Sequence, residues 1–323
     1  MRIMLITPAN RQSRAGNRTT AARWAGLLRE LGHRVQVAVE YRDEPADLMI
    51  ALHAWRSAVA IERFRARYAD RPLVVGLAGT DVYKFLETEP ASTLRSLERA
   101  DALVGLHDRV GDAIPERYRA KLRIIHQSAR PVVRASSRRA EFAVCVIGHL
   151  RAEKDPFRTA EAVRLLPPDS RIRVTHVGRA LDDDWARRAE AEMRENLRYR
   201  WSGDVPGASV RRLLARADLM VLSSVMEGGA NVISEAVVAG VPVIASAIPG
   251  SIGLLGADYP GYFPTGDTAA LAALLLRAER DADFLATLRR HCAALAPRFT
   301  PERERAAWDA LLASLVRQSA PPG

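Results

Sequence analysis

The stretch SSVMEGGANVISEAVVAGVPVIAS, residues 223–246, decides the fold of this chain. The apolar run Leu219–Leu222 that precedes it predicts a buried strand, and Pro242–Ala245 predicts a second one. Between them, a Gly-Gly turn is followed by apolar residues at helical spacing and then by Gly240, which is well placed to end a helix. The stretch is therefore a parallel strand–helix–strand unit.

In such a unit the helix begins at the carboxyl end of the sheet, where open α/β sheets bind phosphorylated ligands. The backbone amides of Gly228, Gly229, Ala230 and Asn231 would face that ligand. Two acids, Glu227 and Glu235, flank the helix start. A carboxylate can accept hydrogen bonds from two hydroxyls of one ring, which suits a ribose or a sugar. The alternative is a helix-initiating loop with surface acids.

Composition narrows the class of protein. The chain has 323 residues and is 48% apolar, which is comfortable for two domains with packed cores. It has no apolar run of 18 residues and no signal-peptide pattern at its N-terminus, so we expect neither a membrane span nor a membrane partner. Its two cysteines, Cys145 and Cys292, give neither a disulfide framework nor a metal spacing. These features favour a cytoplasmic protein with reduced thiols.

The net charge of +10 comes almost entirely from arginine, because only Lys84, Lys121 and Lys154 are lysines. A basic surface suits nucleic acids or anionic small molecules, and it can also be merely a solvated surface. Aromatic residues are 6% of the chain, and no basic stripe with interleaved aromatics is present. We therefore expect anionic small molecules and no nucleic acid as partners.

Short apolar runs alternate with helical patterns through the first 128 residues. Six of them predict strands: Ile3–Thr7, Val35–Val39, Asp47–Leu52, Leu73–Leu77, Ala102–Leu106 and Leu122–Ile125. Residues 129–140 break the rhythm with proline, serines and arginines, as an interdomain linker does. The alternation then restarts with Phe142–Ile147, Ile172–Val177, Tyr199–Trp201, the opening unit and Tyr262–Pro264.

We therefore predict an α/β protein with two Rossmann-like, doubly wound parallel-sheet domains facing a central cleft. The predicted domains are residues 1–135 and 136–300. Residues 301–323 are predicted to form a C-terminal helix that could pack back on the N-terminal domain.

Several polar residues fall at predicted strand ends or helix starts. Gly16 and Asn17 open the first helix, where a glycine lets the backbone approach the phosphates of a donor or the attacking group. Arg14 and Arg18 could receive the phosphate group of an acceptor. His53, Thr80 and Asp81 follow the third and fourth strands, so either strand end could position an acceptor. A flexible basic loop and a capped structural histidine are the structural alternatives.

Three stretches carry a resemblance. They are Gly16–Ala21 with Arg23-Trp24, Gly148–Phe157 with Arg151 and Lys154, and Met226–Asn231 with Ile248–Gly256. With the two acids, Glu227 and Glu235, separated by seven intervening residues, they resemble glycosyltransferases of the GT-B fold in the large retaining family 4. Within that family they are similar to the selenosugar synthases of selenoneine biosynthesis, over essentially the whole chain.

The resemblance implies a function. Those enzymes couple a UDP-sugar, for which we expect UDP-N-acetylglucosamine, to selenophosphate and release a 1-seleno-sugar, UDP and phosphate. The N-terminal domain would be the acceptor side and the C-terminal domain the nucleotide-sugar side. The implied pathway partners are a selenophosphate synthetase and a downstream selenoneine-forming enzyme.

The resemblance also implies residue roles. Glu235 would bind the uridine ribose, and Glu227 the hydroxyls of the transferred sugar. Arg151 and Lys154 would stabilise the charge that builds on the departing UDP, in place of a metal ion. We therefore expect no cofactor and metal-independent transfer. The acids Asp182-Asp183-Asp184 invite a metal interpretation, but we interpret them as the capped start of a helix.

Three other functions remain open from the sequence. The nearest is a family-4 transferase with a glycan or lipid acceptor, which a basic amphipathic patch on the N-terminal domain would favour. A nucleotide-sugar epimerase on the same fold is more distant, and a non-enzymatic nucleic-acid binder is the third.

Overall fold

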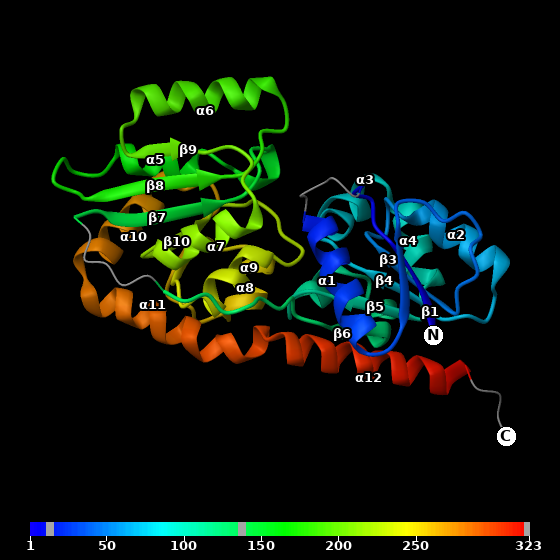
Figure 1. Cartoon of the computed structure of the whole chain (residues 1–323). Helices are drawn as coiled ribbons and strands as arrows, with labels where there is room; N and C mark the ends of the chain where they lie inside the picture. The colour runs from blue at the N-terminus through cyan, green and yellow to red at the C-terminus, as the bar shows by residue number, and fades with distance from the viewer. Residues whose placement is uncertain (11–15, 135–139, 320–323) are drawn as a thin grey trace. The chain divides into compact units, whose positions relative to one another are not determined.

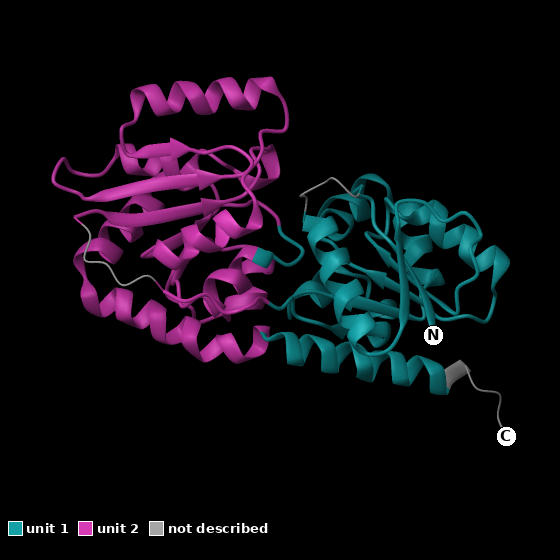
Figure 2. Cartoon of the chain, viewed as in Figure 1, with its two compact units in different colours: residues 1–128, 227–231, 300–323 teal, residues 129–226, 232–299 magenta. Residues whose placement is uncertain are grey.

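The structure, a computed structural model of the whole chain, describes residues 1–10, 16–134 and 140–319. It divides into two compact units, which are coloured separately in Figure 2. Unit 1 consists of Met1–Ser128, Glu227–Asn231 and the residues from Thr300 onward. Unit 2 consists of Ala129–Met226 and Val232–Phe299.

Unit 1 is built on a six-stranded, all-parallel sheet in the order β2-β1-β3-β4-β5-β6. Its strands are β1 (Arg2–Ile6), β2 (Arg34–Ala38), β3 (Leu48–Leu52), β4 (Leu73–Gly76), β5 (Ala102–Gly105) and β6 (Leu122–Ile124). Its helices include α1 (Gly16–Glu30), α2 (Ala58–Arg67), α3 (Leu86–Thr88), α4 (Pro90–Arg99) and α12 (Pro301–Ser319).

Strand periodicity divides the core of unit 1 into two layers. Met4 and Ile6 of β1 pack in one apolar cluster with Phe64 of α2, whereas Ile3 and Leu5 pack in the other. The second cluster includes α1 and α12, which lie side by side in Figure 1. Both layers are needed because the central strands β3, β4 and β5 are buried on both faces.

The contact between α1 and α12 centres on two tryptophans. The ring centroids of Trp24 and Trp308 lie 4.7 Å apart in an edge-on arrangement, and both side chains are fully buried. Gly76 of β4 makes room for Trp24, because a Cβ atom at residue 76 would lie 2.9 Å from the tip of the indole.

Unit 2 is built on a second six-stranded parallel sheet, in the order β12-β11-β10-β7-β8-β9. Its strands are β7 (Phe142–Ile147), β8 (Ile172–Val177), β9 (Tyr199–Trp201), β10 (Leu219–Leu222), β11 (Val243–Ser246) and β12 (Tyr262–Phe263). Its helices are α5 (Arg158–Arg164), α6 (Asp183–Glu195), α7 (Gly207–Arg216), α8 (Asn231–Val238), α9 (Pro249–Leu255), α10 (Thr268–Arg280) and α11 (Ala282–Leu295), with Asn231 itself grouped in unit 1.

The strand orders confirm the predicted fold class of two Rossmann-like parallel sheets. In each sheet the order reverses at one point, between β1 and β3 in unit 1 and between β7 and β10 in unit 2. The crevice outside the carboxyl ends of the strands at such a reversal is where open α/β sheets bind ligands. None of the described helices is long and apolar enough to span a membrane.

The predicted strand boundaries agree with the structure within one residue, but several helical segments are not predicted from the sequence. A π-helical turn, Asp81–Phe85, leads into α3, and α9 covers Pro249–Leu255. The sequence PGSIGLL of α9 contains one proline and two glycines, which suggest a loop. Its proline instead starts the helix, where the missing N–H costs nothing.

Candidate active site

In unit 2, hydrogen bonds link the turn after β7 to the segment after β10. The hydroxyl of Ser223 donates to the carbonyl oxygens of Lys154 (3.2 Å) and Asp155 (2.9 Å). The amide of Val225 donates to the carbonyl of Glu153 at 3.0 Å. The turn that carries Arg151 and Lys154 therefore has a defined position at the point where the strand order reverses.

The start of this turn, Gly148, is held from β8. The carbonyl oxygen of Gly148 can only accept, so His176 donates to it from Nε2 at 3.0 Å, and the Nδ1 of the neutral ring accepts from the hydroxyl of Tyr199 at 2.8 Å. Burial lowers the pKa of His176 to about 4, so the ring is neutral at pH 7. Gly178 lies so close that a Cβ atom there would be 1.9 Å from the Gly148 oxygen.

Arg151 precedes a short 3-10 turn, Ala152–Lys154, and Lys154 is its last residue; Asp155 follows in the left-handed conformation (φ 42°). Arg151 is 39% exposed in its side chain, and its Nε lies 3.9 Å from Glu153 Oε2, beyond hydrogen-bond distance. The stem of Lys154 passes Gly148, where a Cβ atom would lie 3.9 Å from Lys154 Cδ. Two cations thus share one backbone turn.

Glu235 belongs to unit 2 with these cations. It lies on α8, is half-buried, and is surrounded in sequence by the buried residues Ile233, Ala236 and Val237. The hydroxyl of Ser246, at the end of β11, donates to the carbonyl of Ser224 at 2.5 Å and so joins two strand ends on either side of this helix. Gly240 follows α8 with φ 68°, as a helix-ending glycine does.

The glycine loop Glu227–Asn231 is grouped in unit 1, at the ends of β4 and β5. Its backbone nearly touches that of the turn after β4, because a Cβ atom on Gly228 would lie 2.2 Å from the nitrogen of Gly79. A Cβ atom on Gly229 would lie 2.3 Å from Leu106. Glycine is required here for close approach of two backbones.

The predicted residues of the first helix lie at its start. Gly16, Asn17 and Arg18 begin α1, and the hydroxyl of Thr7 donates to the carbonyl of Asn17 at 3.3 Å. Arg14, predicted to receive a phosphate, lies outside the described residues.

His53, Thr80 and Asp81 form one cluster, in which His53 and Asp81 are buried and Thr80 is half-buried. His53, at the end of β3, has φ 76° and accepts at Nδ1 from the amide of Arg56 (3.2 Å), so its Nε2 donates to Thr80 Oγ1 (2.9 Å). Asp81 accepts from the amides of Ala54, Ala78, Gly79 and Val82 at 2.8–3.1 Å. These contacts tie the ends of β3 and β4 together, and the acceptor-binding role of the three residues stays a prediction.

The acids Asp182-Asp183-Asp184 start α6, as interpreted from the sequence. The carboxylate of Asp182 accepts from the amide of Trp185 at 3.1 Å and so caps the helix. Within the described ranges no three His, Cys, Asp or Glu side chains gather as a set of metal ligands. Metal-independence itself stays a prediction.

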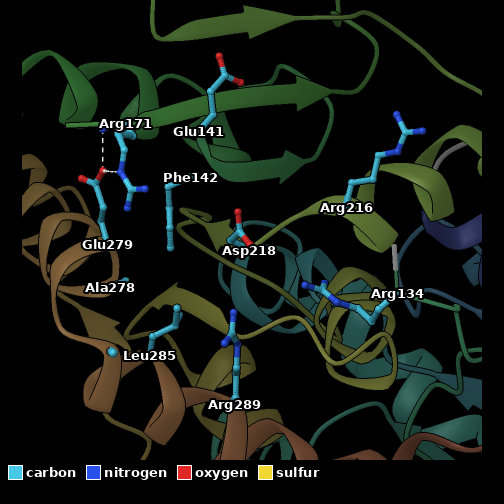
Figure 3. Close-up of a pocket in the computed structure, with 11 residues that line it drawn as sticks. Arg134, Glu141, Phe142, Arg171, Arg216, Asp218, Ala278, Glu279, Leu285 and Arg289 are labelled. Atoms are coloured by element: carbon cyan, nitrogen blue, oxygen red, sulfur yellow. Dashed lines mark hydrogen bonds and ion pairs between the residues drawn. The ribbon is translucent and has the colours of Figure 1, made fainter. Parts of the chain in front are cut away.

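A hollow of about 290 Å³ lies elsewhere in unit 2 (Figure 3). Its wall includes Phe142, the first residue of β7, and Asp218 and Arg171, which directly precede β10 and β8. It therefore lies at the amino edge of the sheet, opposite the edge where the strand ends carry Arg151 and Lys154. The predicted site residues take no part in it.

The site residues predicted from the sequence are thus divided between the two units. Unit 2 contains Arg151, Lys154 and Glu235, whereas unit 1 contains Glu227–Asn231 with the residues of α1 and of the β3 and β4 ends. Sequence reasoning missed the residues that hold these segments: His176, Gly178 and Ser223. His176 lies near the end of a predicted strand and Gly178 directly follows it, which is the one signal that could have pointed to them.

Two parallel Rossmann-like sheets define the GT-B class of protein. The sequence model of the family described as glycosyl transferases group 1 matches residues 133–296, which is more than half of the chain. The chain belongs to this family of glycosyltransferases. No curated protein matches it in sequence.

Solved structures share the fold at low sequence identity. Sucrose-phosphate synthase from Thermosynechococcus elongatus is 18% identical, with a TM-score of 0.82 over 98% of this chain and 99% of that one. Anabaena HepE, solved in complex with UDP and glucose, is 17% identical, with a TM-score of 0.77 over 97% and 100% of the two chains. A glycosyltransferase from Rickettsia africae is 12% identical, with a TM-score of 0.72 over 98% of both chains.

Proposed function

We propose that this glycosyltransferase transfers the sugar of UDP-N-acetylglucosamine to selenophosphate. The general part of this proposal, that the donor is a UDP-sugar, is supported by the family and by two solved structures that share the fold. Anabaena HepE is bound to UDP and glucose. The pneumococcal O-GlcNAc transferase GtfA is bound to UDP and GlcNAc, at 17% identity and a TM-score of 0.66 over 83% of this chain and 57% of that one. The selenium acceptor rests on the resemblance of the three stretches to selenosugar synthases.

The observation that carries the donor assignment is that hydrogen bonds hold the turn after β7 in place. Ser223 and Val225 fix the backbone of Glu153–Asp155, so the cations Arg151 and Lys154 need little reorganisation when charge builds on a leaving phosphate. Such preorganised charge suits departure of a nucleoside diphosphate. Glu235 would accept from the ribose hydroxyls and Glu227 from the sugar hydroxyls.

The proposed chemistry balances with one water molecule. A selenium lone pair attacks the anomeric carbon, the bond from that carbon to the UDP oxygen breaks, and UDP leaves with the electron pair. Water then cleaves the Se–P bond and gives the 1-seleno-sugar and phosphate. Selenium is already nucleophilic, so no general base is assigned. Arg151 and Lys154 replace a metal ion, so EDTA should leave turnover unchanged.

The test is incubation of the protein with UDP-N-acetylglucosamine and freshly generated selenophosphate under anaerobic conditions. We expect equimolar UDP and a selenosugar mass with the selenium isotope pattern. A selenophosphate synthetase is the natural source of the acceptor, and the seleno-sugar would be the substrate of a selenoneine-forming enzyme. Thiophosphate in place of selenophosphate, and other UDP-sugars in place of the donor, test the specificity.

Two results would count against the proposal. Absence of a selenosugar with every common UDP-sugar would exclude the selenium acceptor. UDP release with a glycan or lipid but not with selenophosphate would assign the protein to the ordinary acceptors of its family.

A further inference from the structure

Arg23 links two segments of unit 1 that are remote in sequence. Its Nε donates to Glu304 Oε1 at 3.1 Å, and its Nη1 donates to Asn231 Oδ1 at 2.8 Å. One planar guanidinium thus joins α1, α12 and the glycine loop. The proposed function gives Arg23 no role.

Glu304 fixes the orientation of that guanidinium. The carboxylate is completely buried and also accepts from Trp24 Nε1 (3.0 Å) and from the amide of Ser128 (2.7 Å). A buried carboxylate held by this many donors has little freedom, and it needs a paired cation because an uncompensated buried charge is costly. Arg23, only 16% exposed in its side chain, supplies that charge.

Asn231 lies where the glycine loop ends and α8 begins. The other end of the loop is held by the close approach of Gly228 to Gly79. Arg23 therefore holds the end of the loop that the glycine contact does not reach. Its Nη2 is buried and has no hydrogen-bond partner among the described residues, so the same planar group retains an unused donor nitrogen.

We propose that Arg23 is a positioning residue for the donor diphosphate. Through Asn231 it holds the amides of the loop Gly228–Asn231 in the arrangement that meets the phosphates, and Glu304 holds Arg23. This role rests on the proposed function, because it assigns the loop to the donor phosphates. Geometric errors of about 1 Å at a reacting group cost roughly a hundredfold in rate, so a residue two contacts away can matter.

The variant that tests this role is Arg23→Lys. A lysine can still neutralise Glu304, but a single ammonium does not reproduce the fork that reaches both Glu304 and Asn231. The matched control is Arg29→Lys on the same helix, where the arginine is exposed and donates to the carbonyl of Val35. If Arg23→Lys does not fold, the double variant Arg23→Met with Glu304→Gln removes both buried charges and the contact to Asn231.

Two measurements separate positioning from a structural role. In protein labelled with ¹⁵N-glycine, Arg23→Lys should shift the amide signals of Gly228 and Gly229 and leave Gly105 in place, whereas Arg29→Lys should shift none of these. In steady-state assays Arg23→Lys should lower kcat about tenfold at an unchanged thermal midpoint.

Unshifted loop signals in a folded variant would overturn the inference. A loss of kcat/KM that only follows a loss of folded protein would also overturn it. The glycine signals need no substrate, so they decide the role of Arg23 in holding the loop even if the wild-type protein consumes no UDP-sugar, which would refute only the proposed function.

Discussion

Replacing Gly228 by alanine should abolish most of the transferase activity and leave the fold largely intact. A Cβ atom at residue 228 would lie 2.2 Å from the nitrogen of Gly79 and 2.4 Å from the carbonyl oxygen of Ala78, whereas ordinary contact begins at 3.4 Å. Both neighbours are backbone, so no side chain can move aside. The loop must shift by about 1 Å, the difference between 3.4 and 2.2 Å.

A shift of this size at groups that face a leaving phosphate costs roughly a hundredfold in kcat/KM, or about 2.7 kcal/mol of transition-state stabilisation. The assay is UDP release from UDP-N-acetylglucosamine with selenophosphate, together with circular dichroism to count folded protein. The matched control is Gly207→Ala, because a Cβ atom there meets nothing within 4 Å. If folded Gly228→Ala keeps its kcat/KM within threefold of wild type, the loop has no such role.

Three further predictions concern unit 2. Lys154→Ala should lower kcat by roughly 10²–10³, measured by UDP release beside the exposed Lys84→Ala, and equal effects of the two variants would refute the role of Lys154. The pKa of His176 is lowered to about 4 in the folded state, so only the unfolded chain binds its proton between pH 6.5 and 4. The free energy of unfolding should therefore decrease as the pH is lowered through that window, by up to about 1.4 kcal/mol per pH unit. His176→Asn should flatten this pH dependence in urea melts, and a variant slope identical to that of the wild type would contradict the prediction. Asp182→Ala should cost about 1 kcal/mol through the lost helix cap, seen as a lower urea midpoint, and no change would show that the cap is redundant.

The sequence predicted the central strands of the sheets well because these strands are buried on both faces. Runs such as Leu219–Leu222 are apolar throughout, which is the pattern expected of a strand that is covered on both faces. It failed at α9, where a proline and two glycines suggest a loop although the proline is helix-starting. Local composition could not show which of these tendencies prevails.

Candidate site residues were predictable where they share a backbone turn, as Arg151 and Lys154 do. The residues that hold such turns were not, because their contacts span many positions. Ser223 reaches Lys154 from 69 residues away, and Trp24 reaches Glu304 from 280 residues away. Contacts between residues so far apart leave no periodic pattern in the sequence. The residue type of a buried serine or glutamate does not indicate which distant residue it will contact.

The pairing of Arg23 with Glu304 sets an order for folding during synthesis. The two residues are 281 positions apart, so at roughly 5–20 residues per second the carboxylate is made about 15–60 s after the guanidinium. All of unit 2 is translated in that interval. Until then the cluster around Trp24 lacks Trp308, and α1 alone covers the apolar face of the first sheet that α12 later shares. The nascent N-terminal half is therefore the part of this protein that a chaperone would meet first, and unit 2 is the first that can complete its core.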